Sequence, residues 1–386
     1  MTTIYLDYAA TTPVAKEVVT QMLHYLDITA IFANPASVQH SLGEQAELAV
    51  KKARCEIATH LNAHPKQLFF TSGATESNNL VLKGLAYRQH HQGKHIVTSA
   101  TEHKSVVDCC RYLETQGFQI TYLRPNGNGL LDLNELNKAI TSETFLVSIM
   151  QVNNETGVIQ DIASIAEICQ QKQVFFHVDA AQSIGKLAID LNLVAIDFLS
   201  ISGHKFYAPK GIGCLYIRYR AKAALIPLLH GGGQEQGLRA GTLPVHQIVA
   251  MATAFNLQQQ RLQTDWDYLT YLRQCLLDIF NPLDGVQLNG DTKHSVPHII
   301  NLSFDDVPSE ALLIALRDKV AIASGSACNS GAMEASHVLR AMGIEGDRLY
   351  NAVRISFGRY TTEMEIKQAG QQIYEQVQHL RTLALA

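Results

Sequence analysis

Short β-rich runs alternate with longer helical patterns through the middle of this chain, and this alternation constrains the fold more than any other feature. The runs cover residues 67–71, 95–99, 119–123, 145–151, 174–179, 198–202 and 213–217. Strands that alternate with helices form a parallel sheet, because each helix carries the chain back to the same edge. The sequence therefore predicts an α/β fold with a mainly parallel, seven-stranded sheet covered by helices.

A second, smaller α/β unit is predicted in the C-terminal third. A helical stretch over roughly 254–280 is followed by the strand-like runs PHIINLSF and VAIAS, a helix near 309–317 between them, and a terminal helix after Thr361. The 386 residues, 47 % of them hydrophobic, are enough for two cores. We predict a large domain over residues 15–261 and a small domain formed by residues 1–14 and 262–386.

Composition and charge exclude several kinds of protein. The 31 basic and 35 acidic side chains give a net charge of −4, which offers no surplus for binding nucleic acid. Neither a signal peptide nor an apolar stretch long enough to cross a membrane is recognisable. The seven cysteines are scattered without a Cys-x-x-Cys pair, and we expect His90, His91 and His95 to be solvated in a polar loop rather than to bind a metal. These features predict a soluble, cytoplasmic protein with no resident metal.

Reactive residue types follow five of the predicted strands. In open parallel sheets, ligands bind beyond the carboxyl ends of the strands, so these positions are the first to inspect. The segments are Ser72–Glu76, Glu102–His103, Asn153–Glu155, Asp179–Gln182 and Ser202–Lys205. We expect them to meet at one edge of the sheet.

The Ser72–Glu76 segment opens a predicted helix with small residues. Backbone N–H groups in such a turn can approach an anion, and the helix dipole adds roughly half a positive charge there. The same residues are equally compatible with an ordinary capping box, with Ser72 or Thr75 as the N-cap.

Asp179 and Lys205 follow two successive predicted strands. A carboxylate at the end of an apolar strand needs a cation or hydrogen-bond donors, so Asp179 serves either a site or a structural salt bridge. Lys205 alone would be read as a surface lysine, and His103 alone as a surface or structural histidine. A lysine, an acid and a phosphate turn together meet the needs of pyridoxal phosphate, which requires a Schiff-base lysine, an acid facing its pyridinium nitrogen and a phosphate site.

Longer motifs carry a family resemblance over nearly the whole chain. The start YLDYAATTPV and the runs SGATESNN, TEHKSV, QVNNETG, HVDAAQSIGK, SISGHKFYAPKGIGCLYI, GGGQEQGLRAGT, SGSACNSG and VRISFGR resemble the cysteine desulfurases. They look most like the class V aminotransferase-fold enzymes that supply sulfur for iron–sulfur clusters and nitrogenase maturation. The resemblance implies the fold type I of pyridoxal-phosphate-dependent transferases and a homodimer.

The resemblance also implies roles for individual residues. Lys205 would form the Schiff base, Asp179 would bind the pyridinium proton, Gln182 would bind the phenolic oxygen, and His103 would stack on the ring and help to move protons. The implied phosphate ligands are Ala74, Thr75, Ser202, His204 and Thr242 of the other subunit. Asn34, Asn154 and Arg354 are implied to bind the substrate carboxylate, with Asn154 also close to the cofactor.

Cys328 is the implied nucleophile that takes the substrate sulfur as a persulfide. Its neighbours in residues 323–331 are almost all small, which is typical of a mobile loop, and about ten residues can reach at most roughly 33 Å. A buried cysteine is the alternative, but no apolar periodicity surrounds it. The persulfide would pass to an iron–sulfur scaffold or another acceptor protein, and a transient cluster contact through Cys328 is conceivable.

Two other functions remain open at this point. A selenocysteine or cystine lyase, or an aminotransferase, would keep the cofactor but need no loop thiol. A sulfur-relay or scaffold-binding module without turnover would have lost Lys205 or Asp179, and both are present. The sequence therefore predicts a pyridoxal-phosphate-dependent enzyme that converts L-cysteine to L-alanine.

Overall fold

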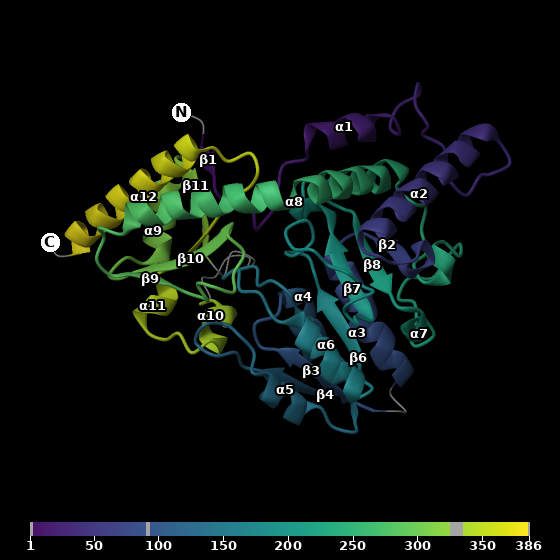
Figure 1. Ribbon diagram of the computed structural model, residues 1–386, viewed down its shortest axis with the longest axis horizontal. Helices are drawn as coiled ribbons and strands as arrows, with labels where there is room; N and C mark the ends of the chain where they lie inside the picture. The colour runs from purple at the N-terminus through teal and green to yellow at the C-terminus, as the bar shows by residue number, and fades with distance from the viewer. Residues whose placement is uncertain (1–2, 90–92, 325–334, 385–386) are drawn as a thin grey trace.

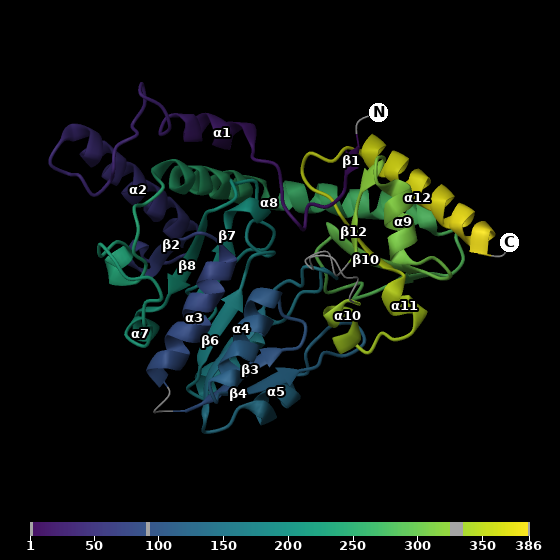
Figure 2. The same ribbon diagram turned by 180° about the vertical axis from the view of Figure 1, so that it is seen from behind.

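The structure is a computed structural model that describes residues 3–89, 93–324 and 335–384. Two lobes lie side by side, and α8 (Val245–Phe280) runs through both (Figures 1 and 2). Both ends of the chain lie in the lobe that holds the C-terminal helix α12 (Glu363–Ala384). The first residues of the chain therefore lie next to residues more than 300 positions further along. For example, the hydroxyl of Thr3 donates a hydrogen bond to the carbonyl oxygen of Asp318, 315 residues away.

The larger lobe contains a seven-stranded sheet of order β2-β8-β7-β6-β5-β3-β4. Its strands are β2 (Leu68–Thr71), β3 (His95–Ser99), β4 (Gln119–Leu123), β5 (Thr144–Met150), β6 (Phe175–Asp179), β7 (Phe198–Ser202) and β8 (Gly213–Ile217). All neighbours pair in parallel except β8, which is antiparallel to β2 and β7. The link from β7 to β8 is too short for a crossover helix, so the chain must reverse direction there. The predicted seven-stranded, mainly parallel sheet is confirmed.

Helices cover both faces of this sheet. One face packs against α1 (Lys16–Leu23), α2 (Ser41–His60), α6 (Ile162–Gln171) and the first half of α8, through side chains such as Ile57, Ile165 and Ile248. The other face packs against α3 (Ala74–Gln89) and α4 (Lys104–Thr115), through Leu85 and Leu113 among others. Burial on both sides explains why most strands read as continuous apolar runs instead of alternating ones. The short helices α5 (Leu133–Ala139) and α7 (Tyr219–Lys222) and the 3-10 helices η1 (Pro65–Gln67) and η3 (Glu235–Gly237) lie in the connections.

The smaller lobe contains a four-stranded antiparallel sheet of order β12-β13-β10-β9. Its strands are β9 (Val286–Leu288), β10 (Ile299–Phe304), β12 (Ala323–Ser324) and β13 (Ala352–Ser356). The N-terminal β1 (Ile4–Tyr5) pairs in parallel with β11 (Val320–Ala321). Helices α9 (Ser309–Leu316), α10 (His337–Ala341), α11 (Asp347–Tyr350) and α12 complete this lobe.

Helix α8 begins at Val245, nine residues before the expected start near residue 254. Its N-terminal half contributes Phe255 to the core of the large lobe, and its C-terminal half contributes Leu272 and Leu276 to the core of the small lobe. Because Pro244 precedes it without a side-chain cap, the sequence carries no strong start signal there. The predicted boundary at residues 261/262 falls inside this continuous helix, and the division into two domains stays a prediction.

Candidate active site

A cavity of about 600 Å³ lies at the carboxyl ends of the parallel strands, facing the small lobe. Segments that follow β2, β3, β5, β6 and β7 all contribute to its wall, and β13 and α10 contribute from the other side. The predicted site residues in the wall are Ala74, Thr75, His103, Asn154, Asp179, Gln182, Ser202, His204, Lys205 and Arg354. Residues distant in sequence therefore meet around a space of the size that small-molecule sites have.

Three predicted site residues are not in this wall. Asn34 is exposed, and its Oδ1 accepts a hydrogen bond from the backbone N–H of Ala36 at 3.0 Å. Thr242 is also exposed, shortly before α8 begins. Cys328 lies outside the described residues, but Ala335 and the two residues after it belong to the cavity wall.

Lys205 ends the short 3-10 helix η2 (Gly203–Lys205) that directly follows β7. Its Nζ donates hydrogen bonds to the carbonyl oxygens of Ala9 at 2.6 Å and Ala10 at 2.8 Å. Behind it, Lys186 Nζ donates to the carbonyl oxygen of Lys205 at 2.7 Å. Burial and the charge of Lys205 lower the pKa of Lys186 to about 7. The amine of Lys205 is thus held at the cavity by the N-terminal segment, and its backbone is held by a second lysine.

Asp179 ends β6 and is only 5 % exposed. Its Oδ1 accepts from the backbone N–H of Ala181 at 2.9 Å, and its Oδ2 accepts from Nδ2 of Asn78 at 2.7 Å. Two N–H donors therefore satisfy this carboxylate in the described part of the chain.

His103 is the N-cap of α4 and lies in the same wall. Its Nδ1 accepts from the backbone N–H of Ser105 at 3.1 Å and lies 2.8 Å from the hydroxyl of Ser105. Burial lowers the pKa of His103, the positive charge of Lys205 lowers it further, and the charge of Asp179 opposes both effects. The ring is therefore neutral at neutral pH.

In the turn after β2, a carboxylate from the first turn of α3 binds the backbone. Ser72 donates its backbone N–H to Glu76 at 2.7 Å, and Glu76 pairs with Arg239 at 2.9 Å. Helix α3 then begins at Ala74, beside Ser202 and His204 in the cavity wall. A side chain at Gly213 would place its Cβ 2.5 Å from the Cα of Gly73, so the absence of a side chain lets this turn sit against the sheet. The turn lines the cavity at the N-terminus of α3, where the helix dipole favours an anion.

Arg354 reaches the cavity from β13 in the small lobe. Its Nη2 donates to Oδ1 of Asp7 at 2.8 Å, and its Nη1 donates to the carbonyl oxygen of Asn154 at 3.0 Å. Its Nε is buried and has no partner within the described ranges. A guanidinium that already pairs with one carboxylate can still donate hydrogen bonds to a second carboxylate, supplied by a ligand.

Sequence reasoning gave no individual role to two residues of the wall, Glu155 and His337. Glu155 is buried, accepts a hydrogen bond from the hydroxyl of Ser336, and has its pKa raised to about 7 by burial. The neighbouring His337 donates from Nε2 to the carbonyl oxygen of Glu102 at 2.9 Å. Glu155 belongs to the predicted strand-end segment Asn153–Glu155 but had no assigned role, whereas His337 carries no sequence signal. These contacts join α10 of the small lobe to the large lobe.

The expectation for the histidine group is wrong for His95. This residue begins β3 and is buried, with Nδ1 2.7 Å from Oγ1 of Thr144 and Nε2 2.8 Å from Oγ1 of Thr121. Neighbouring strands supply both hydroxyls, which no local pattern reveals. His90 and His91 lie outside the described residues.

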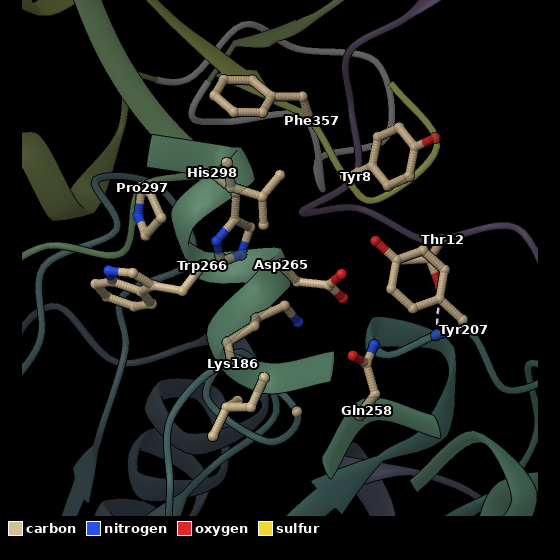
Figure 3. A pocket seen from close by; sticks show the side chains of 14 residues that line it. Tyr8, Thr12, Lys186, Tyr207, Gln258, Asp265, Trp266, Pro297, His298 and Phe357 are labelled. Carbon is tan, nitrogen blue, oxygen red and sulfur yellow. Dashed lines mark hydrogen bonds between the residues drawn. The ribbon is translucent and has the colours of Figure 1, made fainter. Parts of the chain in front are cut away.

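A second, smaller cavity lies between the lobes (Figure 3). Lys186 and His298 face it from opposite lobes, and Asp265 of α8 also lies in its wall. Asp265 pairs with Arg359 at 2.6 Å. Its volume of about 20 Å³ holds no more than one or two water molecules. This cavity is part of the joint between the lobes and is too small for a substrate.

No described helix combines the length and apolarity that crossing a membrane requires. Among residues 3–89, 93–324 and 335–384, no three His, Cys, Asp or Glu side chains gather in a way that could hold a metal ion.

The chain belongs to the aminotransferase class-V family, whose model matches residues 4–369. One relative, from Buchnera aphidicola subsp. Acyrthosiphon pisum (strain 5A), is named cysteine desulfurase IscS; the two are 51 % identical over 383 residues, covering 99 % of this chain and 95 % of the relative. Among solved structures, a NifS-like protein has a TM-score of 0.90 at 34 % identity, covering 98 % of this chain and 99 % of that one. The structure titled "SspA in complex with cysteine" has a TM-score of 0.83 at 39 % identity, covering 93 % and 100 %.

Proposed function

We propose that this protein is a cysteine desulfurase that uses pyridoxal phosphate to convert L-cysteine to L-alanine and keeps the sulfur as a persulfide on Cys328. One observation carries the proposal: Lys205, Asp179, His103 and an anion-binding turn converge on a single cavity that Arg354 enters from the other lobe. The names of the relatives support the same activity.

The residues of the cavity fit pyridoxal phosphate. The N-terminus of α3, Ser202 and His204 supply donors for a phosphate, and burial together with nearby lysines lowers the pKa of His204 to about 4. Asp179 would hold the ring nitrogen, Gln182 the phenolic oxygen, and the amine of Lys205 the cofactor itself. When bound, this cofactor withdraws electrons from the bonds around the substrate's Cα.

The remaining residues would bind and orient L-cysteine. Arg354, with Asn154 and Asn34, would hold the substrate carboxylate, a planar acceptor that suits a guanidinium. Lys205 would take up the proton lost from Cα. The neutral ring of His103 would lie against the cofactor.

The sulfur step balances without an added oxidant. The thiolate of Cys328 would attack the substrate sulfur, so that an S–S bond forms and the C–S bond breaks; after proton uptake the products are alanine and the Cys328 persulfide. The thiolate is the reactive form of cysteine. Cys328 precedes Ala335 of the cavity wall by seven residues, a length of chain that spans at most about 25 Å.

A homodimer would complete the site, with Thr242 of the other subunit as a phosphate ligand. Exposed apolar side chains on α1, α2 and the segment between them support this part of the proposal: Leu23 is 58 % exposed, Ile28 84 %, Phe32 52 % and Leu48 61 %. Large apolar side chains exposed on elements adjacent in the sequence are expected at an interface between copies.

The persulfide would be passed to an acceptor protein of iron–sulfur cluster assembly. This use requires a reduced thiol, as a cytoplasmic location provides. The cysteines in the described part of the chain are all free thiols, in agreement with such a compartment.

The first experiment is an absorption spectrum of the purified protein during titration with L-cysteine, with alanine and sulfide assayed. We expect a cofactor band that changes with cysteine, and alanine release that Cys328→Ala abolishes. Cys275→Ala, on a partly buried cysteine of α8, is the matched control and should retain activity. Alanine release by Cys328→Ala at the wild-type rate would instead assign the chain to the lyases that need no loop thiol.

A further inference from the structure

A chain of hydrogen bonds runs from Asp179 to His103 beneath the cavity. Nδ2 of Asn78 donates to Oδ2 of Asp179 at 2.7 Å and to Oγ of Ser105 at 2.8 Å. The hydroxyl of Ser105 in turn lies 2.8 Å from Nδ1 of His103. Asn78 comes from α3, Ser105 from α4 and Asp179 from β6, and His103 is the N-cap of α4, so three elements are joined at this point.

The direction of each bond follows from its neighbour. The NH₂ of Asn78 faces Asp179 and donates to its Oδ2. The same NH₂ donates to the Ser105 oxygen, which leaves the Ser105 O–H to point at Nδ1 of His103. The backbone N–H of Ser105 also points at this nitrogen, at 3.1 Å. Nδ1 therefore receives two donors and can carry no proton of its own.

We propose that Asn78 and Ser105 are positioning residues that link Asp179 to His103 and hold the neutral imidazole of His103 with its proton on Nε2. The inference rests on the proposed function for its consequence. A ring in this tautomer can donate a hydrogen bond from Nε2 but cannot accept a proton there. His103 then acts in the site as a donor, and uptake of the Cα proton falls to Lys205.

The burial of Asn78 limits which groups it can bind. Asn78 is fully buried, and its Oδ1 has no partner among the residues described, so both of its polar contacts go through the NH₂. The charged or titratable groups that act on His103 are Asp179, Lys205, His337 and Asp108. Of these, only Asp179 is joined to the ring by the chain of hydrogen bonds described above.

The direct test is ¹⁵N NMR of histidine-labelled holoenzyme, with His103→Gln used to assign the resonances. We expect the Nδ1 of His103 at a pyridine-type shift and Nε2 at a pyrrole-type shift across neutral pH. The reverse pattern, with the proton on Nδ1, would overturn the proposal. The same spectra of the protein without its cofactor show whether the hydrogen bonds from Ser105 set the tautomer of His103 when no cofactor is bound.

Variants test the bridge itself. Ser105→Ala removes one donor to Nδ1, so the neutral ring loses stabilisation, and we expect the pKa of His103 to rise. Asn78→Ala should also raise the pKa of His103. The double variant, Asn78→Ala with Ser105→Ala, should raise this pKa no further than Ser105→Ala alone, because both residues act through the hydroxyl of Ser105. Asn79→Ala is the matched control, since Asn79 donates to the carbonyl oxygen of Thr75 and not to this chain.

The kinetic effect should be modest. One neutral hydrogen bond is worth about a two- to tenfold change, and we expect that loss in kcat for Ser105→Ala with KM for cysteine unchanged. A merely structural role would lower Tm without moving the pKa of His103. An unchanged pKa in Ser105→Ala, or additive shifts in the double variant, would refute the link. Failure of the wild type to release alanine would refute the proposed function instead, and the NMR result would still decide the tautomer.

Discussion

The two sheets of this protein contribute to one cavity in different ways. The seven-stranded sheet supplies residues just beyond the carboxyl ends of its parallel strands, among them Asp179 and Lys205. The four-stranded antiparallel sheet supplies Arg354 from within β13. Arg354 bonds to Asp7, 347 residues away in sequence, and to Asn154, 200 residues away.

This difference separates the two tasks of the site. The carboxyl ends of parallel strands lie side by side as a result of the topology. Here the residues proposed to hold the cofactor follow these strand ends. The substrate-facing arginine comes from the other lobe, so binding of the substrate carboxylate depends on how the two lobes meet. Cofactor retention and substrate affinity should therefore respond to different substitutions.

Replacement of Lys205 should have the largest effect. Lys205→Ala removes both the anchor for the cofactor and the base at Cα, and a positioned acid–base group contributes about 10²- to 10⁴-fold. We expect at least that loss in kcat, together with loss of the absorption change on adding cysteine. Lys172→Ala, at the exposed end of α6, is the control. Normal turnover in Lys205→Ala would rule out its role.

Replacement of Arg354 should affect substrate binding and leave the cofactor in place. Arg354→Gln removes charge-assisted hydrogen bonds worth about 1.5–3 kcal/mol, so KM for cysteine should rise roughly 10- to 100-fold. The cofactor content, measured from the absorbance of the purified protein, should match the wild type. Loss of cofactor with an unchanged KM would contradict the division between the two sheets.

Glu155 tests the joint between the lobes through pH. Its pKa is raised by burial from 4.5 to about 7, so the folded protein binds a proton that the unfolded chain releases in this range. The stability that Glu155 contributes is thus complete below about pH 4.5 and is lost as the pH rises through 7, by roughly 3 kcal/mol at most.

Glu155→Gln should remove this dependence. Denaturant unfolding at pH 5 and pH 7.5 should show a smaller fall in the free energy of unfolding for the variant than for the wild type. Glu56→Gln, on the partly exposed surface of α2, is the control and should follow the wild type. Equal falls in all three proteins would mean that Glu155 titrates normally.

Much of the fold and of the strand-end cluster could be predicted from the sequence. The apolar runs at 95–99, 119–123, 198–202 and 213–217 coincide with β3, β4, β7 and β8. β3, β7 and β8 are buried along their whole length, and the β-rich composition that marks such strands is a local signal. The residues after such runs gather for a reason of topology, so Asp179, His103 and Lys205 could be placed near one another in advance.

Other features could not be predicted, because they depend on contacts between distant segments. The two-residue strand β1 is recognisable only by its pairing with β11. His95 looked solvated because the hydroxyls that bind it come from other strands. Asn78 and Ser105 look like ordinary helix residues until α3 and α4 pack beside β6.

The sequence by itself determined which reactive side chain follows which strand. It therefore also determined which of these groups lie at the carboxyl ends of the parallel strands. The tertiary structure alone decided how these groups are held, through the carbonyl oxygens of Ala9 and Ala10 at Lys205, Asp7 at Arg354 and Asn78 at Asp179. The physical reason is the separation along the sequence between the residues that interact. Hydrophobic periodicity is written in neighbouring residues, whereas a hydrogen bond depends on where two distant segments come to lie.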